Sequence, residues 1–184
     1  SQHHSIPVMD KEVRLFCDKM PENARIIDVG GCWGWHWRDV SKIRPDIKIF
    51  IVDFIKGNLH HAKNILKEDI NQSVFLIHGD ATDLIFDDDV FDGYWSVQTL
   101  QHIPNFKKTI LEAHRVLKKG GLFANYSLNN QFIIRFIYKL LGKEYMVHGN
   151  SSHFYLSRAS QEQKDVVSEV FEQDVQIRHS EIIF

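Results

Sequence analysis

The chain has 184 residues, of which 43% are hydrophobic and 25% charged, and it carries a formal net charge of −2 at pH 7. A chain of this length suits one domain with a sizeable buried core. Its nearly balanced charge excludes a strong overall attraction to nucleic acid or to an anionic membrane. We therefore expect neither a nucleic-acid partner nor stable membrane insertion.

Cysteine and histidine usage indicates a reducing compartment and no metal site. The two cysteines, Cys17 and Cys32, form no CxxC pair and are too few for a disulfide framework. The eleven histidines include no HExxH motif and no His/Cys cluster at zinc spacing. There is no signal pattern at the start, and the longest apolar stretches, around 47–55 and 132–141, are too short or too interrupted to span a bilayer. The sequence thus predicts a soluble, cytoplasmic protein.

The first part of the chain alternates short apolar runs with helical stretches. An amphipathic helix comes first, because apolar residues recur there at three- and four-residue steps. Two apolar strands follow, and a helix succeeds each of them. The predicted elements are a helix over 9–20, a strand over 26–29, a helix from the following glycine-rich loop to about 43, a strand over 47–52 and a helix that starts at 59.

The same alternation continues as far as residue 126 and then loosens. Lys118-Lys-Gly-Gly121 ends a strongly periodic helix with the basic residues and glycines that suit a helix C-terminus. The predicted elements are strands over 73–77, 91–96 and 122–126, a helix over 107–117, and later helices over 132–141 and 160–171 with a strand over 175–179.

Short apolar strands separated by helices imply βαβ units. We predict an α/β fold with a doubly wound, Rossmann-like, mostly parallel sheet and helices on both faces. The chain stops at Phe184 without an obvious turn, which indicates either a truncated chain or a sheet that lacks its usual last strand.

Three glycines and three tryptophans are mixed in the stretch DVGGCWGWHWR, residues 28–38, directly after the first of these strands. Gly30, Gly31 and Gly34 allow positive φ and a close approach of the backbone to a ligand. Backbone N–H groups at the start of the next helix favour a carboxylate. The loop therefore suits a ligand that carries a carboxylate.

Two aspartates follow the next two predicted strands: Asp53 ends the second and Asp80 comes after the third. Ligands of doubly wound sheets bind beyond the carboxyl ends of the strands, so we expect both aspartates to share one crevice with the glycine loop. Asp53 can accept hydrogen bonds from a ribose diol, and Asp80 can accept one from the exocyclic amine of adenine. Phe54 and Ile55 offer the ring an apolar face. A nucleoside with an amino-acid tail fits this set.

These residues stand in an order that resembles the class I S-adenosylmethionine-dependent methyltransferases, and in particular the branch that acts on small molecules. The resemblance covers roughly residues 10–127, and its late segment is more distinctive than any glycine pattern. The segments that carry it are DVGGCWG (28–34), Asp53, Gly79-Asp80-Ala81, Phe91-Asp92 with Ser96, Leu100-Gln-His-Ile103 and LEAHRVLKKGGL (111–122).

The resemblance implies S-adenosylmethionine as cofactor and in-line transfer of its methyl group to a small-molecule acceptor. The methionine part would lie against the loop, with the ribose at Asp53 and the adenine edge at Asp80 and Ala81. Ser96 and Val97 would face the methyl group. The implied cofactor-binding residues are Asp28, Gly30, Gly31, Cys32, Trp33, Gly34, Asp53, Phe54, Asp80, Ala81, Ser96 and Val97.

The acceptor site and the proton acceptor are expected near the methyl group. His102 is the candidate general base for an acceptor that must lose a proton, although the family often carries a histidine here that is no base. Family substrate pockets often form after the fifth strand, which makes four residues candidates for acceptor binding: Asn125, Tyr126, His148 and Tyr155. The single domain, 1–184, then comprises an N-terminal helix region (1–23), a cofactor-binding core (24–127) and a substrate or cap region with the final strand (128–184).

The loop departs from the family's Asp-x-Gly-x-Gly-x-Gly pattern, because Cys32 stands at the middle glycine and Gly31 precedes it. Trp33 follows where a small residue is common. We expect cofactor binding to survive these changes. Trp33 and Trp35 either line the ligand site or pack the next helix on the sheet, whereas Trp37 is expected in the core.

Three other functions compete with small-molecule methylation. A nicotinamide-dependent oxidoreductase is disfavoured because G-x-G-x-x-G fails from both Gly30 and Gly31. A nucleic-acid methyltransferase is disfavoured by the charge and by Ser96-Val-Gln-Thr99, which stands where an Asn-Pro-Pro-Tyr-type motif would be. A non-catalytic binding or regulatory protein that kept the fold stays open, as do a cap role for Asp53 and a turn role for Asp80.

Overall fold

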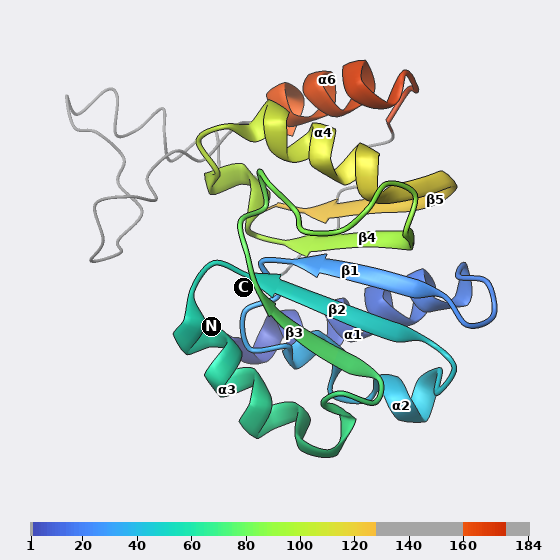
Figure 1. Cartoon of the computed structure of the whole chain (residues 1–184), viewed down its shortest axis with the longest axis vertical. Helices are drawn as coiled ribbons and strands as arrows, with labels where there is room; N and C mark the ends of the chain where they lie inside the picture. Colours follow the sequence, from blue (N-terminus) through green and yellow to red (C-terminus); the bar gives the residue numbers. More distant parts are fainter. Residues whose placement is uncertain (1, 128–159, 176–184) are drawn as a thin grey trace.

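The computed structural model describes residues 2–127 and 160–175, which form one parallel sheet with helices on both faces (Figure 1). The strands pair in the order β3-β2-β1-β4-β5, and every pairing is parallel. This confirms the predicted α/β, Rossmann-like fold. The strands are β1 (Arg25–Val29), β2 (Lys48–Asp53), β3 (Val74–His78), β4 (Phe91–Val97) and β5 (Leu117–Tyr126).

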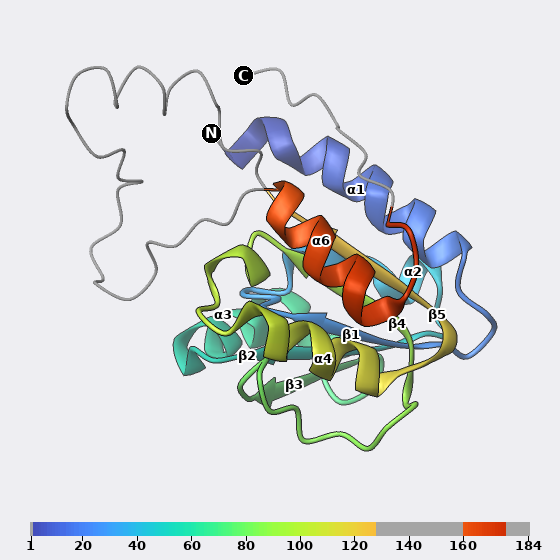
Figure 2. The same ribbon diagram turned by 90° about the horizontal axis from the view of Figure 1, so that it is seen from above.

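The helices divide between the two faces of the sheet (Figures 1 and 2). One face carries α1 (Gln2–Asp18), α2 (Val40–Ile43) and α3 (Lys56–Leu66). The other face carries α4 (Phe106–Val116) and α6 (Ser160–Phe171), the second of which confirms a predicted helix. Three short 3-10 turns complete the chain order: η1 (Trp35–Trp37), η2 (Lys67–Asp69) and η3 (Leu100–His102).

Alternating side chains of the strands build a separate hydrophobic layer on each face. Towards α1, α2 and α3 the layer contains Ile49 and Ile51, and towards α4 and α6 it contains Ile27 and Tyr94. Trp37 and Trp95 are fully buried in the first layer, with their ring centroids 5.7 Å apart. The predicted core position of Trp37 is therefore confirmed.

The strand order reverses next to β1. The chain moves outward from β1 through β2 to β3 and then returns to place β4 on the other side of β1. The loops that follow β1 and β4 diverge at this switch point, which is where open α/β sheets bind their ligands.

Three predictions of local structure need correction. The first helix begins at Gln2, well before the predicted residue 9. The helix predicted from the glycine loop to residue 43 is broken into η1 and α2. At the break, Trp37 donates to the buried Asp28 of β1, whereas Arg38 pairs with Asp10 of α1.

The third correction concerns the start of β5. The residues Lys118-Lys-Gly-Gly121, predicted to end a helix, belong to an irregular first part of the strand. Phe91 pairs with Leu117 and Gly93 with Leu122, so extra residues of β5 loop out between the two pairs. Gly120 permits this, with a φ of 80°. The helix predicted over 132–141 and, beyond Val175, the strand predicted over 175–179 lie outside the described residues.

Close packing of α1 on β4 generates a stability prediction. A Cβ atom at Gly93 would lie 2.8 Å from Phe16 Cζ and 2.9 Å from Met20 Sδ, both in the buried layer. We expect Gly93→Ala to lower the free energy of unfolding by about 1 to 3 kcal/mol, because overpacking displaces α1. Gly57→Ala is the control, since a Cβ there would meet only Ile55 Cγ2 at an ordinary 3.9 Å and should stabilise α3 by up to about 1 kcal/mol. Urea unfolding of both variants measures the difference, and equal effects would contradict the packing argument.

Candidate functional site

The loops that follow the first four strands meet at the carboxyl edge of the sheet. The backbone N–H of Cys32 donates to Asp53 Oδ2 at 3.0 Å, which ties the glycine loop to the end of β2. The Gly79 N–H donates to the Asp53 carbonyl at 3.2 Å, which adds the end of β3. The Thr99 hydroxyl donates to the Gly30 carbonyl at 3.2 Å, which adds the loop after β4. The structure thus brings together the segments that the sequence placed in one crevice.

The glycine loop alternates between left-handed and ordinary backbone. Gly30, Cys32 and Gly34 have φ values of 72°, 51° and 66°. Cys32 therefore occupies a conformation that favours glycine, at a cost of about 1 to 2 kcal/mol for a residue with a Cβ. A Cβ at Gly30 would lie 2.2 Å from the side chain of Thr99, and one at Gly34 would lie 2.6 Å from Leu66. These glycines are required by the packing of the loop itself.

A buried carboxylate supports this loop from below. Asp28 is 1% exposed, and its Oδ2 accepts a 2.7 Å hydrogen bond from the Trp37 indole N–H. A Cβ at Gly31 would lie 2.5 Å from that oxygen, so the loop can cross Asp28 only with glycine at this position. Burial raises the pKa of Asp28 to about 7, against the opposing effect of the Trp37 hydrogen bond, and the nearby Asp53 raises it further. Any part for Asp28 in cofactor binding then acts through the shape of the loop.

The Asp53 carboxylate is the meeting point of the loop and α3. Besides the Cys32 N–H, it accepts hydrogen bonds at Oδ1 from the Ile55 N–H at 2.8 Å and from Asn58 Nδ2 at 3.1 Å. A carboxylate has about four acceptor positions, so one remains for a further donor such as a hydroxyl. Asp53 itself is buried, but Phe54 beside it is 66% exposed.

The three tryptophans of the loop region differ in burial. Trp37 lies in the core, whereas Trp33 is 43% and Trp35 is 42% exposed. Trp33 lies against His61 of α3, with 5.5 Å between ring centroids, and Trp35 lies under the Arg38 guanidinium at 4.7 Å. Both rings are thus partly exposed, unlike Trp37, and a role for them in lining the ligand site stays a prediction.

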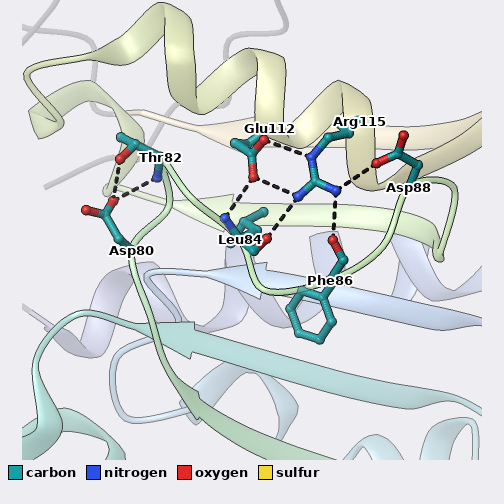
Figure 3. Close-up of polar contacts among 7 residues, drawn as sticks. All are labelled: Asp80, Thr82, Leu84, Phe86, Asp88, Glu112 and Arg115. Atoms are coloured by element: carbon teal, nitrogen blue, oxygen red, sulfur yellow. Dashed lines mark hydrogen bonds and ion pairs between the residues drawn. The ribbon is translucent and has the colours of Figure 1, made fainter.

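The loop after β3 presents Asp80 (Figure 3), and the next residue, Ala81, is buried. Asp80 is exposed, and its Oδ1 accepts hydrogen bonds from the Thr82 N–H at 2.8 Å and the Thr82 hydroxyl at 2.9 Å. This is the turn geometry that the alternative interpretation predicted. Among the described residues no hydrogen bond reaches Oδ2, so this oxygen is available to a donor such as an amine.

An arginine of α4 fixes the rest of that loop (Figure 3). The Arg115 guanidinium donates to the carbonyls of Leu84 at 2.9 Å and Phe86 at 2.7 Å, and it pairs with Asp88 at 2.8 Å. Glu112 holds the guanidinium from the helix side through two contacts of 2.8 Å. Arg115 lowers the pKa of Glu112 and is itself held charged. The distinctive segment 111–122 therefore includes a clamp on the loop that carries Asp80.

The predicted residues at the end of β4 have structural partners. Ser96 is fully buried, and its hydroxyl donates to the Val29 carbonyl at 2.8 Å, so it joins β4 to β1. Val97 is half-buried and packs against the layer that contains Trp95. Thr99, which sequence reasoning did not select, wedges its side chain against Gly30. No spacing or charge signal marks such a wedge in the sequence.

The predicted catalytic and acceptor-binding residues are placed only in part. His102 is half-buried in η3, with Nε2 3.0 Å from Gln101 Nε2. Asn125 Nδ2 donates to Gln163 Oε1 of α6 at 3.0 Å, and the Tyr126 hydroxyl donates to Glu12 Oε2 of α1 at 3.0 Å. His148 and Tyr155 lie outside the described residues. His102, Asn125 and Tyr126 all lie near the carboxyl edge, in or just before the loops after β4 and β5.

Within 2–127 and 160–175, no group of three or more His, Cys, Asp or Glu side chains could hold a metal ion. The helices of the same part of the chain include none with the length and apolar content needed to cross a membrane.

Comparisons with known proteins agree with this geometry. The family described as "Methyltransferase domain" matches residues 27–125, just over half of the chain. The chloroplastic 2-methyl-6-phytyl-1,4-hydroquinone methyltransferase 2 of Oryza sativa subsp. japonica is 30% identical over 105 residues, which cover 57% of this chain and 29% of that protein. The chain thus spans less than half the length of this curated relative.

Solved structures share the fold at low sequence identity. The YcgJ protein of Bacillus subtilis has a TM-score of 0.68 at 22% identity, over 91% of this chain and 68% of that one. The phosphoethanolamine N-methyltransferase 2 of Haemonchus contortus, solved with phosphomonomethylethanolamine and S-adenosylhomocysteine, has a TM-score of 0.63 at 17% identity, over 88% and 36% of the two chains.

The buried Asp28 predicts a pH dependence of stability. Its pKa is raised in the folded chain, so the folded state holds the proton more tightly than the unfolded state and stability falls as pH rises from about 4 to about 7. Asp28→Asn keeps the acceptor for Trp37 but cannot ionise. We expect the free energy of unfolding of the wild type to fall, relative to the variant, by about 2 to 4 kcal/mol across this window.

Urea unfolding at several pH values measures this difference. A direct NMR titration of the Asp28 side-chain carboxyl carbon provides a second measurement that needs no variant. Parallel pH profiles for the two proteins, with an Asp28 midpoint near that of an exposed aspartate, would contradict the account.

Proposed function

We propose that this chain, which belongs to the methyltransferase-domain family, binds S-adenosylmethionine at the carboxyl edge of its sheet and transfers the methyl group to a small-molecule acceptor. The observation that carries the proposal is the hydrogen-bonded convergence of the glycine loop, Asp53 and the loop of Asp80 on one edge. Three large apolar side chains are exposed beside this edge: Phe54, Ile55 and Trp33.

The donors and acceptors at this edge fit the parts of the cofactor. The remaining acceptor position of Asp53 supports a ribose hydroxyl, and Asp80 Oδ2 supports the exocyclic amine of adenine. Phe54 and Ile55 supply an exposed apolar face for the adenine ring. The backbone of Gly30 to Gly34 would hold the amino-acid end, because it turns repeatedly through positive φ beside the start of η1.

Methyl transfer needs few catalytic side chains. S-adenosylmethionine, when bound, supplies a methyl group on a positively charged sulfur whose thioether is a good leaving group. The chain then has to orient the acceptor in line and exclude water. Ser96 would keep β4 fixed against β1 beneath the reacting groups. His102 stays the candidate base for an acceptor that must lose a proton.

The acceptor that we propose is a small organic molecule, in a cytoplasmic setting. The rice relative is named for a hydroquinone, and the nematode enzyme was solved with a phosphorylated amine. These names support a small-molecule acceptor over a nucleic acid. Because the two compounds differ chemically, we propose only the class of acceptor, a small organic molecule. The net charge of −2 supports the same choice.

Titration calorimetry with S-adenosylmethionine and S-adenosylhomocysteine tests cofactor binding. We expect binding in the micromolar range, and a loss of at least about tenfold in Asp53→Asn and Asp53→Ala, because each removes a charged acceptor. Asp83→Asn is the control, since Asp83 is exposed in the neighbouring loop. Binding without turnover of any small-molecule acceptor would favour the non-catalytic alternative. No binding by the wild-type chain would contradict the proposal.

The clamp of Arg115 predicts a separate effect on the cofactor. Arg115→Lys keeps the charge but loses the forked contacts to the Leu84 and Phe86 carbonyls, so the loop that carries Asp80 loosens. We expect KM for S-adenosylmethionine to rise about tenfold while kcat changes less than about twofold. The reason is that the lost contacts stabilise the bound cofactor equally in the ground state and in the transition state.

Arg44 offers a matched control for this variant. Its guanidinium clamps the carbonyls of Cys17 and Pro21 and the carboxylate of Asp46, at the amino edge of the sheet. Arg44→Lys should therefore cost stability without changing KM. Equal rises of KM in both variants would show a general loss of structure and would contradict the positioning role of Arg115.

A further inference from the structure

A basic groove lies between α3 and the edge strand β3, which run side by side at one end of the sheet (Figure 1). Its volume is about 290 Å³. Two leucines and four basic side chains line it: Leu59, Leu76, Lys56, His60, Lys63 and His78. Asp53 and Asp80 are not among the lining residues, but His78 contacts Phe54, so the groove borders the proposed cofactor site without including its two aspartates.

The basic side chains of α3 converge by helical periodicity. Lys56, His60 and Lys63 are spaced by four and three residues and therefore share one face of the helix. Neither α3 nor β3 contains an Asp or Glu. Among the described residues, Lys56 and Lys63 form no ion pair. The groove therefore concentrates positive charge that the protein does not neutralise there.

His78 joins this face from the end of β3. Its Nε2 lies 2.9 Å from the Phe54 carbonyl oxygen, and a carbonyl can only accept, so Nε2 carries the hydrogen. The second ring nitrogen, Nδ1, has no hydrogen-bond partner among the described residues. The ring also lies near the Phe54 ring, at 6.2 Å between centroids. A fixed histidine beside two unpaired lysines suits a compact anion.

We propose that this groove binds the phosphate group of a small phosphomonoester or of a lipid headgroup. Lys56, Lys63 and the two histidines would surround the phosphate, and Leu59 and Leu76 would contact the apolar part of the ligand. Lysine and histidine can bind phosphate through single N–H donors, and they do not require the planar, bidentate geometry of arginine. A patch of this size on a chain of net charge −2 is too local for the extended basic surface that nucleic acid requires.

NMR titration of the histidine ring protons tests the site directly in the chain as it exists. The probes are glycerol 3-phosphate and inorganic phosphate, and, in a separate arm, phosphatidylcholine vesicles with and without phosphatidic acid. We expect saturable shifts of His60 and His78 in the millimolar range or below, with His114 of α4 unmoved.

A double variant and a charge-matched control decide whether the groove is responsible. Lys56→Ala/Lys63→Ala should weaken phosphate binding about tenfold, because two charged donors are lost. Lys108→Ala/Lys119→Ala removes the same charge from exposed positions in α4 and β5, which do not line the groove, and should leave binding unchanged.

The two arms identify the source of the phosphate. Binding of glycerol 3-phosphate supports a small phosphomonoester, and binding only to vesicles with phosphatidic acid supports a lipid headgroup. No saturable shift with any probe, or equal weakening by both double variants, would overturn the proposal. Because the groove borders the cofactor site, calorimetry with S-adenosylmethionine on the same variants is needed to distinguish a loss of phosphate binding from a loss of cofactor binding.

Discussion

The hydrogen bond between the buried Asp28 carboxylate and the Trp37 indole is the constraint on which the rest of the site depends. It lies directly beneath the glycine loop, and its oxygen occupies the space that a side chain at Gly31 would need. The loop can therefore pass over Asp28 only with glycine at position 31. Burying the Asp28 carboxyl with Trp37 as its one hydrogen-bond partner among the described residues lowers the stability of the folded state. This loss of stability accompanies the fixed shape of the glycine loop.

Two further contacts turn that fixed loop into an edge shared by several strands. Asp53 accepts the Cys32 N–H, which joins the ends of β1 and β2, and Arg115 holds the loop after β3 from the opposite face of the sheet. The chemistry of methyl transfer depends mainly on such positioning, because the leaving group is already activated. An ordered edge made of backbone amides and two aspartates therefore meets the main requirement of the proposed reaction.

The sequence was sufficient to predict the order of the sheet-forming elements and the meeting of the glycine loop with Asp53, because strand periodicity and the βαβ rule act locally. It was not sufficient for contacts that depend on three-dimensional packing. The wedge of Thr99 against Gly30 and the break of the helix after the loop leave no periodic signal. The exposure of Trp33 was also undecided, since the same residue suits a core or a ligand site.

Backbone amide NMR spectra with and without S-adenosylhomocysteine test the central claim most directly. The account predicts that the largest shifts fall on the glycine loop from Gly30 to Gly34, on Phe54 and Ile55, and on Asp80 to Thr82, while the amino edge around Arg44 stays unchanged. These segments come from three separate strands, so a concerted response would show that they form one site. Shifts elsewhere with an unchanged glycine loop would contradict the account.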